Sequence, residues 1–268
     1  MTGRPRPRVV YADLDGTLTG PGGSMFAGAD GSTSTRAAEA VAALHRAGVA
    51  LVPTTGRNAA QAREAARLLG ADAFIAELGG LLARAPDWEV ERLAPAAGGR
   101  TPVEAMARSG AGALLLEAFA GCLEPHAPWA FEGRQVTMLF RGLIDDGAAS
   151  SLLRDAGHRL EVADNGRIDG RFPALETEEV HAYHLLPAGV GKGPAIAADL
   201  RHRGLGPDDA LVVGDSPADV AAPGHVGSVV LVANGAWAAP GPGDPVSITN
   251  AAYGDGFAEA VASLLDDS

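Results

Sequence analysis

The fold of this chain is decided by the stretch 9-VVYADLDGTLTG-20, in which a short apolar run ends in two acidic residues. Residues 9–12 carry no charge, which is typical of a strand that a parallel sheet buries on both faces. Asp13 and Asp15 follow at once, within an Asp-x-Asp-Gly-Thr sequence. The stretch therefore predicts a buried strand that brings two carboxylates to one edge of a sheet.

Four more apolar runs of similar length end in small or polar residues: GVALVPTTG, ADAFIAE, ALVVGDS and SVVLVAN. Helical patterns lie between runs of this kind, in STRAAEAVAALHRAGV, NAAQAREAARLLG and GKGPAIAADLRHRGLG. These helices are expected to close at Gly48, Gly70 and Gly204. Because strand and helix alternate, the predicted fold class is α/β, with a Rossmann-like, doubly wound parallel sheet as its core.

The alternation breaks after Gly80, where a different pattern begins. Residues 81–184 contain helix-like PVEAMARSGAGALLLEAFA and DDGAASSLLRDAG, and strand-like GRQVTMLFRG, HRLEVAD and HAYHLLP. Antiparallel strands with helices on one face are the simplest arrangement of such a segment. We therefore expect residues 1–80 and 185–268 to form the core, and residues 81–184 to form an inserted α+β cap domain.

Composition narrows the function classes. The chain has 268 residues, a 47% hydrophobic content and a formal net charge of -12, so a large core is expected and nucleic acid or an anionic membrane is not an expected partner. No apolar run approaches the roughly 20 residues that a membrane span needs. The basic start MTGRPRPR is followed by too short an apolar run for a signal peptide. Because Cys122 has no second cysteine to pair with, we expect a cytoplasmic protein.

Polar residues follow several of the predicted strands, at the edge where ligands bind in open α/β sheets. They are Asp13, Asp15, Thr54, Thr55, Asp215 and Asp219, with Lys192 at the start of a helix after the inserted segment. Asp13 and Asp15 are two residues apart, so an extended backbone would point both carboxylates into one pocket.

Each of these residues also has a plainer interpretation. Asp-Gly-Thr is suited to a simple turn, and GDSPAD to a loop with an N-capping aspartate. Thr54 and Thr55 could cap the helix that begins near Asn58, and Lys192 could be an ordinary surface lysine. The ordered occurrence of all of them at successive strand ends favours a shared site.

Charge suggests what that site binds. Two carboxylates 4 Å apart repel each other by roughly 4 kcal/mol at an effective dielectric constant of 20, so the acidic cluster requires a cation. An all-oxygen set of ligands without His or Cys favours Mg²⁺. Thr55, the backbone N–H of Gly56 and Lys192 would supply donors and positive charge to an anion. Together these groups indicate phosphoryl transfer.

With these residues the chain resembles the haloacid dehalogenase superfamily of phosphohydrolases. The four motifs that carry the resemblance are DLDGT, TTGR, GVGKGPA and GDSPAD, in this order along the chain. The inserted segment and the run HLLPAGVGKGPAI are similar to the branch with the larger α/β cap (C2B type), which includes Cof-like, sucrose-phosphate and mannosyl-phosphoglycerate phosphatases.

The resemblance implies a role for each matched residue. Asp13 would be the nucleophile, and Asp15 the general acid and base. Mg²⁺ would be held by the Asp13 carboxylate, the main-chain carbonyl of Asp15 and Asp215. Thr55, Gly56 and Lys192 would hold the phosphoryl oxygens, with Ser216 and Asp219 in support, Asp219 acting through water or by orienting Lys192.

Two departures from the branch pattern are visible. Ala218 stands where relatives usually carry Asn before the aspartate of the fourth motif, and Glu77-Leu78-Gly79-Gly80 stands in place of Glu-Asn-Gly. The first leaves a metal-side contact undefined, and the second removes an expected substrate contact.

The predicted function is Mg²⁺-dependent hydrolysis of a small phosphorylated metabolite, in particular a sugar or polyol phosphate. The alternatives are a sugar phosphotransferase or phosphomutase, and a catalytically silent metabolite-binding module. Four polar residues of the insertion could contact a polar substrate: Arg134, Arg141, His181 and His184. The sequence predicts no particular oligomeric state.

Overall fold

The core of the protein is a five-stranded parallel sheet with the strand order β12-β11-β10-β1-β2. A computed structural model describes residues 6–95, 98–222, 224–239 and 246–266. The strands are β1 (Val9–Ala12), β2 (Ala50–Pro53), β10 (Ala210–Gly214), β11 (Ser228–Leu231) and β12 (Val246–Ile248). β1 pairs with β2 on one side and with β10 on the other. The strand order therefore reverses between β1 and β10, and ligands bind at such a switch point in open sheets.

Helices cover both faces of this sheet. Alternate residues of β1 enter different cores: Val10 and Ala12 pack in one cluster, Val9 and Tyr11 in another. The first cluster includes α1 (Arg36–Arg46) and α8 (Tyr253–Asp266), and the second includes α6 (Lys192–Arg203). The continuous apolar run at the start of the chain is thus a strand buried on both faces, as predicted.

A hairpin extends the core beyond β2. β3 (Ala73–Ala76) follows α2 (Ala59–Leu68) and meets the end of β2 through a bridge between Thr54 and Ile75. β4 (Leu81–Arg84) and β5 (Glu89–Arg92) then continue the sheet in antiparallel fashion from β3. The expected domain boundary after residue 80 stays a prediction, and strand pairing favours placing it after β5.

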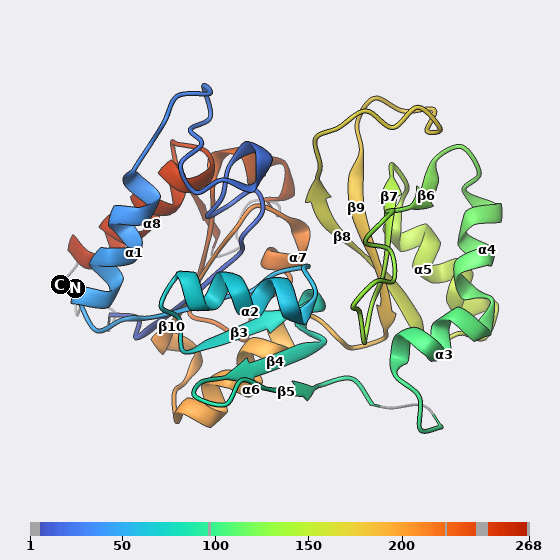
Figure 1. Cartoon of the computed structure of the whole chain (residues 1–268), viewed down its shortest axis with the longest axis horizontal. Helices are drawn as coiled ribbons and strands as arrows, with labels where there is room; N and C mark the ends of the chain where they lie inside the picture. Colours follow the sequence, from blue (N-terminus) through green and yellow to red (C-terminus); the bar gives the residue numbers. More distant parts are fainter. Residues whose placement is uncertain (1–5, 96–97, 223, 240–245, 267–268) are drawn as a thin grey trace.

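A second, antiparallel sheet lies beside the core (Figure 1). Its order is β6-β7-β9-β8, with β6 (Leu123–Pro125), β7 (Met138–Gly142), β8 (Leu160–Arg167) and β9 (His181–Pro187). α3 (Pro102–Ser109), α4 (Ala111–Ala118) and α5 (Asp146–Asp155) contribute to its apolar core. The helical run expected from residue 102 is broken in two at Gly110, whose φ of 80° is left-handed.

The two parts meet where the short helix α7 (Pro217–Val220) of the core lies beside β8 of the cap. The predicted fold class, a Rossmann-like parallel core with an inserted α+β domain, is confirmed. No helix in the described ranges is long and apolar enough to cross a membrane.

Candidate active site

The site lies at the carboxyl end of β1, beside the switch in strand order. The backbone N–H of Asp13 donates to the Val213 carbonyl over 2.9 Å, so this residue continues the ladder between β1 and β10. Asp215 follows β10, and Lys192 is the first residue of α6. Parallel strands therefore bring these residues to one edge although the sequence separates them widely.

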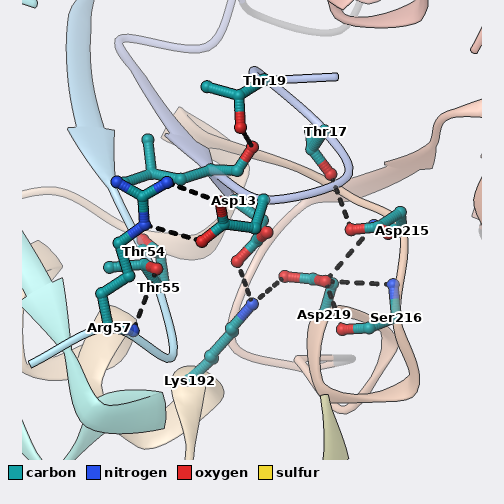
Figure 2. A network of polar contacts seen from close by, with 12 residues as sticks. Asp13, Thr17, Thr19, Thr54, Thr55, Arg57, Lys192, Asp215, Ser216 and Asp219 are labelled. Atoms are coloured by element: carbon teal, nitrogen blue, oxygen red, sulfur yellow. Dashed lines mark hydrogen bonds and ion pairs between the residues drawn. The ribbon is translucent and has the colours of Figure 1, made fainter. Parts of the chain in front are cut away.

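Lys192 connects two carboxylates at the centre of the site (Figure 2). Its Nζ lies 2.7 Å from Asp13 Oδ1 and 2.7 Å from Asp219 Oδ1, and all three side chains are buried. Together with Asp215 these residues form what we call the Asp13 cluster. The interpretation of Lys192 as a surface lysine is thereby excluded.

The cluster has more negative than positive charge. Three carboxylates, those of Asp13, Asp215 and Asp219, share one ammonium group. Burial raises the pKa of Asp13 to about 7, although the Lys192 ammonium lowers it. Burial and the Asp13 charge likewise hold the pKa of Asp215 well above its usual range. Burial lowers the pKa of Lys192, but the two paired carboxylates more than offset this and leave it raised.

Both carboxylate oxygens of Asp219 accept hydrogen bonds from the protein. Its Oδ2 accepts from the Ser216 hydroxyl over 2.7 Å and from the backbone N–H groups of Ser216 and Asp215, while its Oδ1 holds Lys192. Of the two positions that the sequence left open for Asp219, this geometry matches the one that orients Lys192. The loop interpretation of GDSPAD is correct in part, since Ser216 and Asp219 do form a capping box.

Asp215 is anchored so that one oxygen remains available. The Thr17 hydroxyl donates to its Oδ1 over 2.9 Å. Its Oδ2 lies against the backbone of the Asp-x-Asp-Gly loop, because a Cβ added to Gly16 would come within 2.2 Å of this atom. Glycine is therefore required at position 16, whose φ is 93°.

Thr54 and Thr55 have different tasks. The Thr54 hydroxyl donates to the Val52 carbonyl, whereas the Thr55 oxygen accepts from the Arg57 backbone N–H over 3.2 Å. The Thr55 proton is thus free to be donated to a ligand. Asn58, and neither threonine, caps α2 with a capping box.

Asp15 does not share the pocket of Asp13, contrary to the expectation from their spacing. β1 ends at Ala12 and a turn begins at Leu14, so the side-chain alternation of a strand does not extend to Asp15. The Asp15 side chain is 53% exposed and forms a two-pronged ion pair with Arg57. The two distances are 2.7 Å from Nε to Oδ2 and 2.5 Å from Nη2 to Oδ1.

The cap approaches the second motif with two polar side chains. A Cβ on Gly56 would come within 2.6 Å of Asn165 Nδ2 and 2.8 Å of His184 Nε2. Asn165 lies in β8 where the register shifts between Asp164 and Arg167, and such an irregularity redirects side chains. Position 56 therefore has to be glycine for the cap to contact the core here.

His184 is neutral and presents a lone pair to this space. Burial and the nearby Arg134 cation hold its pKa well below the usual range. The Thr137 hydroxyl donates to Glu77 and accepts from Arg134, so its oxygen also accepts from Nδ1 of His184, 3.1 Å away. The proton is thereby assigned to Nδ1, and Nε2 is an acceptor.

Glu77 fastens the segment that leads into β7. Its carboxylate is fully buried and accepts from the backbone N–H groups of Gln135, Val136 and Thr137 over 2.8 to 2.9 Å. Arg134 adds a bond from Nη1 to the Gly56 carbonyl. The Glu-Leu-Gly-Gly departure thus retains a glutamate that ties cap to core.

The other polar residues considered in the cap do not gather at this point. Arg141 pairs with Glu124 and lies over the ring of Phe172. His181 bonds to Asp164 over 2.7 Å. Of the four candidates, the structure brings His184 and Arg134 to Gly56.

Sequence reasoning missed Arg57, Thr17 and Asn165. Arg57 and Thr17 lie inside the matched motifs TTGR and DLDGT, so their membership of these motifs could have identified them. Asn165 carried no signal, since only the fold brings it over Gly56.

A family model for haloacid dehalogenase-like hydrolases matches residues 10–93, which include the first two motifs. This match confirms the resemblance to haloacid dehalogenase-like hydrolases that the motifs predicted. A phosphoglycolate phosphatase from Methanoculleus marisnigri is 28% identical over 255 residues, which is 95% of each chain. Together with the family model, this relative supports the phosphatase class that the motifs predicted.

Solved structures agree on the fold of this hydrolase. The sucrose-phosphatase from Synechocystis is 18% identical, with a TM-score of 0.65, and the match covers 97% of this chain and 98% of that one. A sugar phosphatase of haloacid dehalogenase subclass IIB is 17% identical, with a TM-score of 0.59 over 97% and 100% of the two chains. The cap type expected from the sequence matches these folds.

Proposed function

We propose that this phosphatase hydrolyses a small phosphate monoester with Mg²⁺, through an aspartyl-phosphate on Asp13. The observation that carries the proposal is the different hydrogen bonding of the two Asp13 carboxylate oxygens. Its Oδ1 is held by Lys192, while its Oδ2 has no hydrogen-bond partner in the described part of the chain. One oxygen is therefore fixed and the other is free to react.

A cradle for the transferred phosphoryl group surrounds this oxygen. Thr55 has a hydroxyl proton to donate. The backbone N–H groups of Leu14, Asp15 and Gly56 have no acceptor among the described residues. Lys192 adds the positive charge that a phosphate requires. These donors support a site for three phosphoryl oxygens.

The reaction would proceed in two displacements. Asp13 Oδ2 attacks phosphorus while the ester P–O bond breaks, and Asp15 gives its proton to the leaving oxygen. Water then attacks the phosphoryl group, Asp15 takes a proton from it, and the bond between Asp13 and phosphorus breaks. The products are an alcohol and inorganic phosphate.

The residues fit a hard divalent cation. Asp13 and Asp215 carry carboxylates with raised pKa values, and the Asp15 carbonyl would complete the set of oxygen ligands. No cluster of three or more acidic, His or Cys side chains suited to a metal occurs in the described ranges, so the fit depends on two carboxylates and a carbonyl. Mg²⁺ bound there would neutralise charge on the phosphoryl group.

The relatives favour a particular substrate class. The matched archaeal relative is named a phosphoglycolate phosphatase, so 2-phosphoglycolate is the first candidate. The sucrose-phosphatase was solved with sucrose and phosphate, but it shares only the fold, and a sugar or polyol phosphate is the second candidate. A sugar phosphomutase remains the alternative reaction, and a silent binding module the alternative class.

Phosphate release tests this proposal. The wild type should release inorganic phosphate from 2-phosphoglycolate with Mg²⁺ and lose the activity with a chelator. Asp13→Asn should remove activity, whereas Asp15→Asn should slow turnover by about 10²-fold or more because it lacks the general acid. Equal activity in the wild type and Asp13→Asn would refute the nucleophile, and transfer of phosphate to a second sugar would identify a mutase.

Lys192→Ala tests the cradle separately. It should weaken binding of inorganic phosphate, because Asp13 and Asp219 lose the ammonium group that bonds to both of them. A phosphate affinity equal to that of the wild type would remove Lys192 from the proposed site.

A further inference from the structure

Arg57 holds the carboxylate of Asp15 in a planar, two-pronged ion pair at the rim of the site. A guanidinium fork of this kind matches a carboxylate in shape as well as in charge. The side chains of Arg57 and Asp15 are 29% and 53% exposed, so solvent and ligands reach both. The pair is therefore a carboxylate-binding site that an internal residue now fills.

This pair is an obstacle to the proposed reaction. Asp15 has to face the leaving oxygen above Asp13, but both of its oxygens are turned to Arg57. In Figure 2 Arg57 lies on the side of Asp13 away from Asp215, one of the proposed metal ligands. For Asp15 to act, another group has to replace its carboxylate in the ion pair with Arg57.

The surroundings of Arg57 indicate where a substrate would lie. On one side is the segment after the first motif, since a Cβ on Gly23 would come within 3.6 Å of Arg57 Nη2 and 3.9 Å of Asp15 Oδ1. Asn165 and His184 of the cap approach Gly56, the residue before Arg57 in the chain. A leaving group bound at Arg57 would thus lie next to the segment that contains Gly23 and close to the point where the cap meets Gly56.

Two arginines lie near this space. Arg134 is buried and donates to the carbonyls of Trp129 and Gly56 and to the Thr137 hydroxyl, whereas Arg57 is partly exposed. Asn165 is uncharged, its amide has no hydrogen-bond partner in the described ranges, and His184 is neutral. Lys192 is occupied by Asp13 and Asp219. An anionic group on the leaving alcohol would therefore be recognised by Arg57.

We propose that Arg57 binds a carboxylate on the leaving group, and that this carboxylate displaces Asp15 and frees it to face the ester oxygen. The inference rests on the proposed phosphatase reaction and deepens it. It assigns the substrate class as phosphate monoesters with a carboxylate close to the ester oxygen. Arg57 is then the residue that determines specificity.

Two esters that differ only in this group test the proposal. In 2-phosphoglycolate the leaving group carries a carboxylate, and in 2-hydroxyethyl phosphate a neutral CH₂OH replaces it. We would measure kcat/KM for both esters with wild type, Arg57→Gln and Arg57→Lys. Arg63→Gln is the matched control, because Arg63 is an exposed arginine on the neighbouring helix α2 without an ion pair in the described ranges.

The wild type should prefer 2-phosphoglycolate by about 10- to 100-fold, the value of a hydrogen-bonded charge. Arg57→Gln should bring the ratio close to one, Arg57→Lys should restore part of it, and Arg63→Gln should leave it unchanged. Because the ratio compares two esters on one preparation, it does not depend on the fraction of folded protein.

Failures of the two proposals can be told apart. If the wild type releases phosphate from neither ester nor from any small phosphate monoester, the proposed function fails. If it hydrolyses both esters with equal efficiency, or if Arg57→Gln keeps the wild-type ratio, the role of Arg57 is overturned while the phosphatase reaction stands.

Discussion

Helix α6 contributes a buried charge to two very different clusters. At its first residue, Lys192 supplies the ammonium group that bonds to two of the three carboxylates of the Asp13 cluster. Seven residues on, about 10 Å along the helix, Asp199 is fully buried among partners that neutralise it. It accepts from Arg84 Nε over 2.9 Å, from Arg203 Nε over 2.6 Å and from the Tyr11 hydroxyl over 2.9 Å.

In the second cluster the buried carboxylate is neutralised by partners of the protein itself. Arg203 also pairs with the exposed Asp72, and Arg84 with the exposed Glu91 over 3.5 Å. The one fully buried carboxylate, Asp199, thus meets two guanidinium groups, and each of its oxygens has a donor. The Asp13 cluster has the same kind of residues in the same core, but an excess of negative charge. Buried charge that serves structure is neutralised by the protein, whereas the excess at the Asp13 cluster leaves room for a cation from outside.

The largest expected change in the free energy of unfolding comes from a substitution in the Asp199 cluster. Asp199→Asn leaves two guanidinium groups without their buried partner, and we expect it to lower the free energy of unfolding by about 3–5 kcal/mol. Urea unfolding measures this. Phosphatase activity per folded molecule should stay near the wild-type value, since no atom of Asp199 reaches the Asp13 cluster in the contacts of the structure. A loss below about 1 kcal/mol would show that the two clusters do not differ as described.

The second effect concerns pH in the absence of metal. The pKa of Asp13 is raised in the folded state to about 7. Between the ordinary pKa of an aspartate and pH 7, the folded chain therefore keeps a proton that the unfolded chain has lost. Stability therefore falls as pH rises. Relative to Asp13→Asn, which cannot titrate, the wild type should lose about 2 kcal/mol between pH 5 and pH 7. Urea unfolding of both proteins with a chelator measures the difference, and a difference independent of pH would be incompatible with it.

The smallest change in the free energy of unfolding is expected from the matching Asp-to-Asn substitution at the Asp13 cluster. Asp215→Asn removes one of three crowded charges, and its amide oxygen can still accept from Thr17. With a chelator at pH 8 we expect its free energy of unfolding to equal that of the wild type or exceed it by about 1 kcal/mol. Activity should nevertheless be lost, because a proposed metal ligand is missing. Destabilisation as large as that of Asp199→Asn would refute the contrast.

The sequence predicted the motif residues because each follows a strand or begins a helix of a parallel sheet. Asp13, Lys192 and Asp215 could therefore be placed together from their order alone. The direction of Asp15 could not be predicted, because it depends on where β1 stops and on an ion pair with Arg57.

Contacts between residues far apart in the chain could not be predicted from local sequence patterns. Asp199 lies in an ordinary helical stretch, and only the fold brings Tyr11 and Arg84 to it. The pattern of alternating strands and helices ends at Gly80, where the sequence predicts the start of the insertion. The hairpin of β4 and β5 that follows pairs with β3, and local patterns carry no signal for that pairing.

The most direct test of the excess charge is Mg²⁺ binding by titration calorimetry to wild type, Asp215→Asn and Asp199→Asn at pH 7.5, without substrate. The account predicts that the wild type and Asp199→Asn bind one Mg²⁺ with similar affinity and that Asp215→Asn binds at least about tenfold more weakly. Equal affinity in all three proteins, or no binding to the wild type, would contradict the claim that the Asp13 cluster is built for a divalent cation.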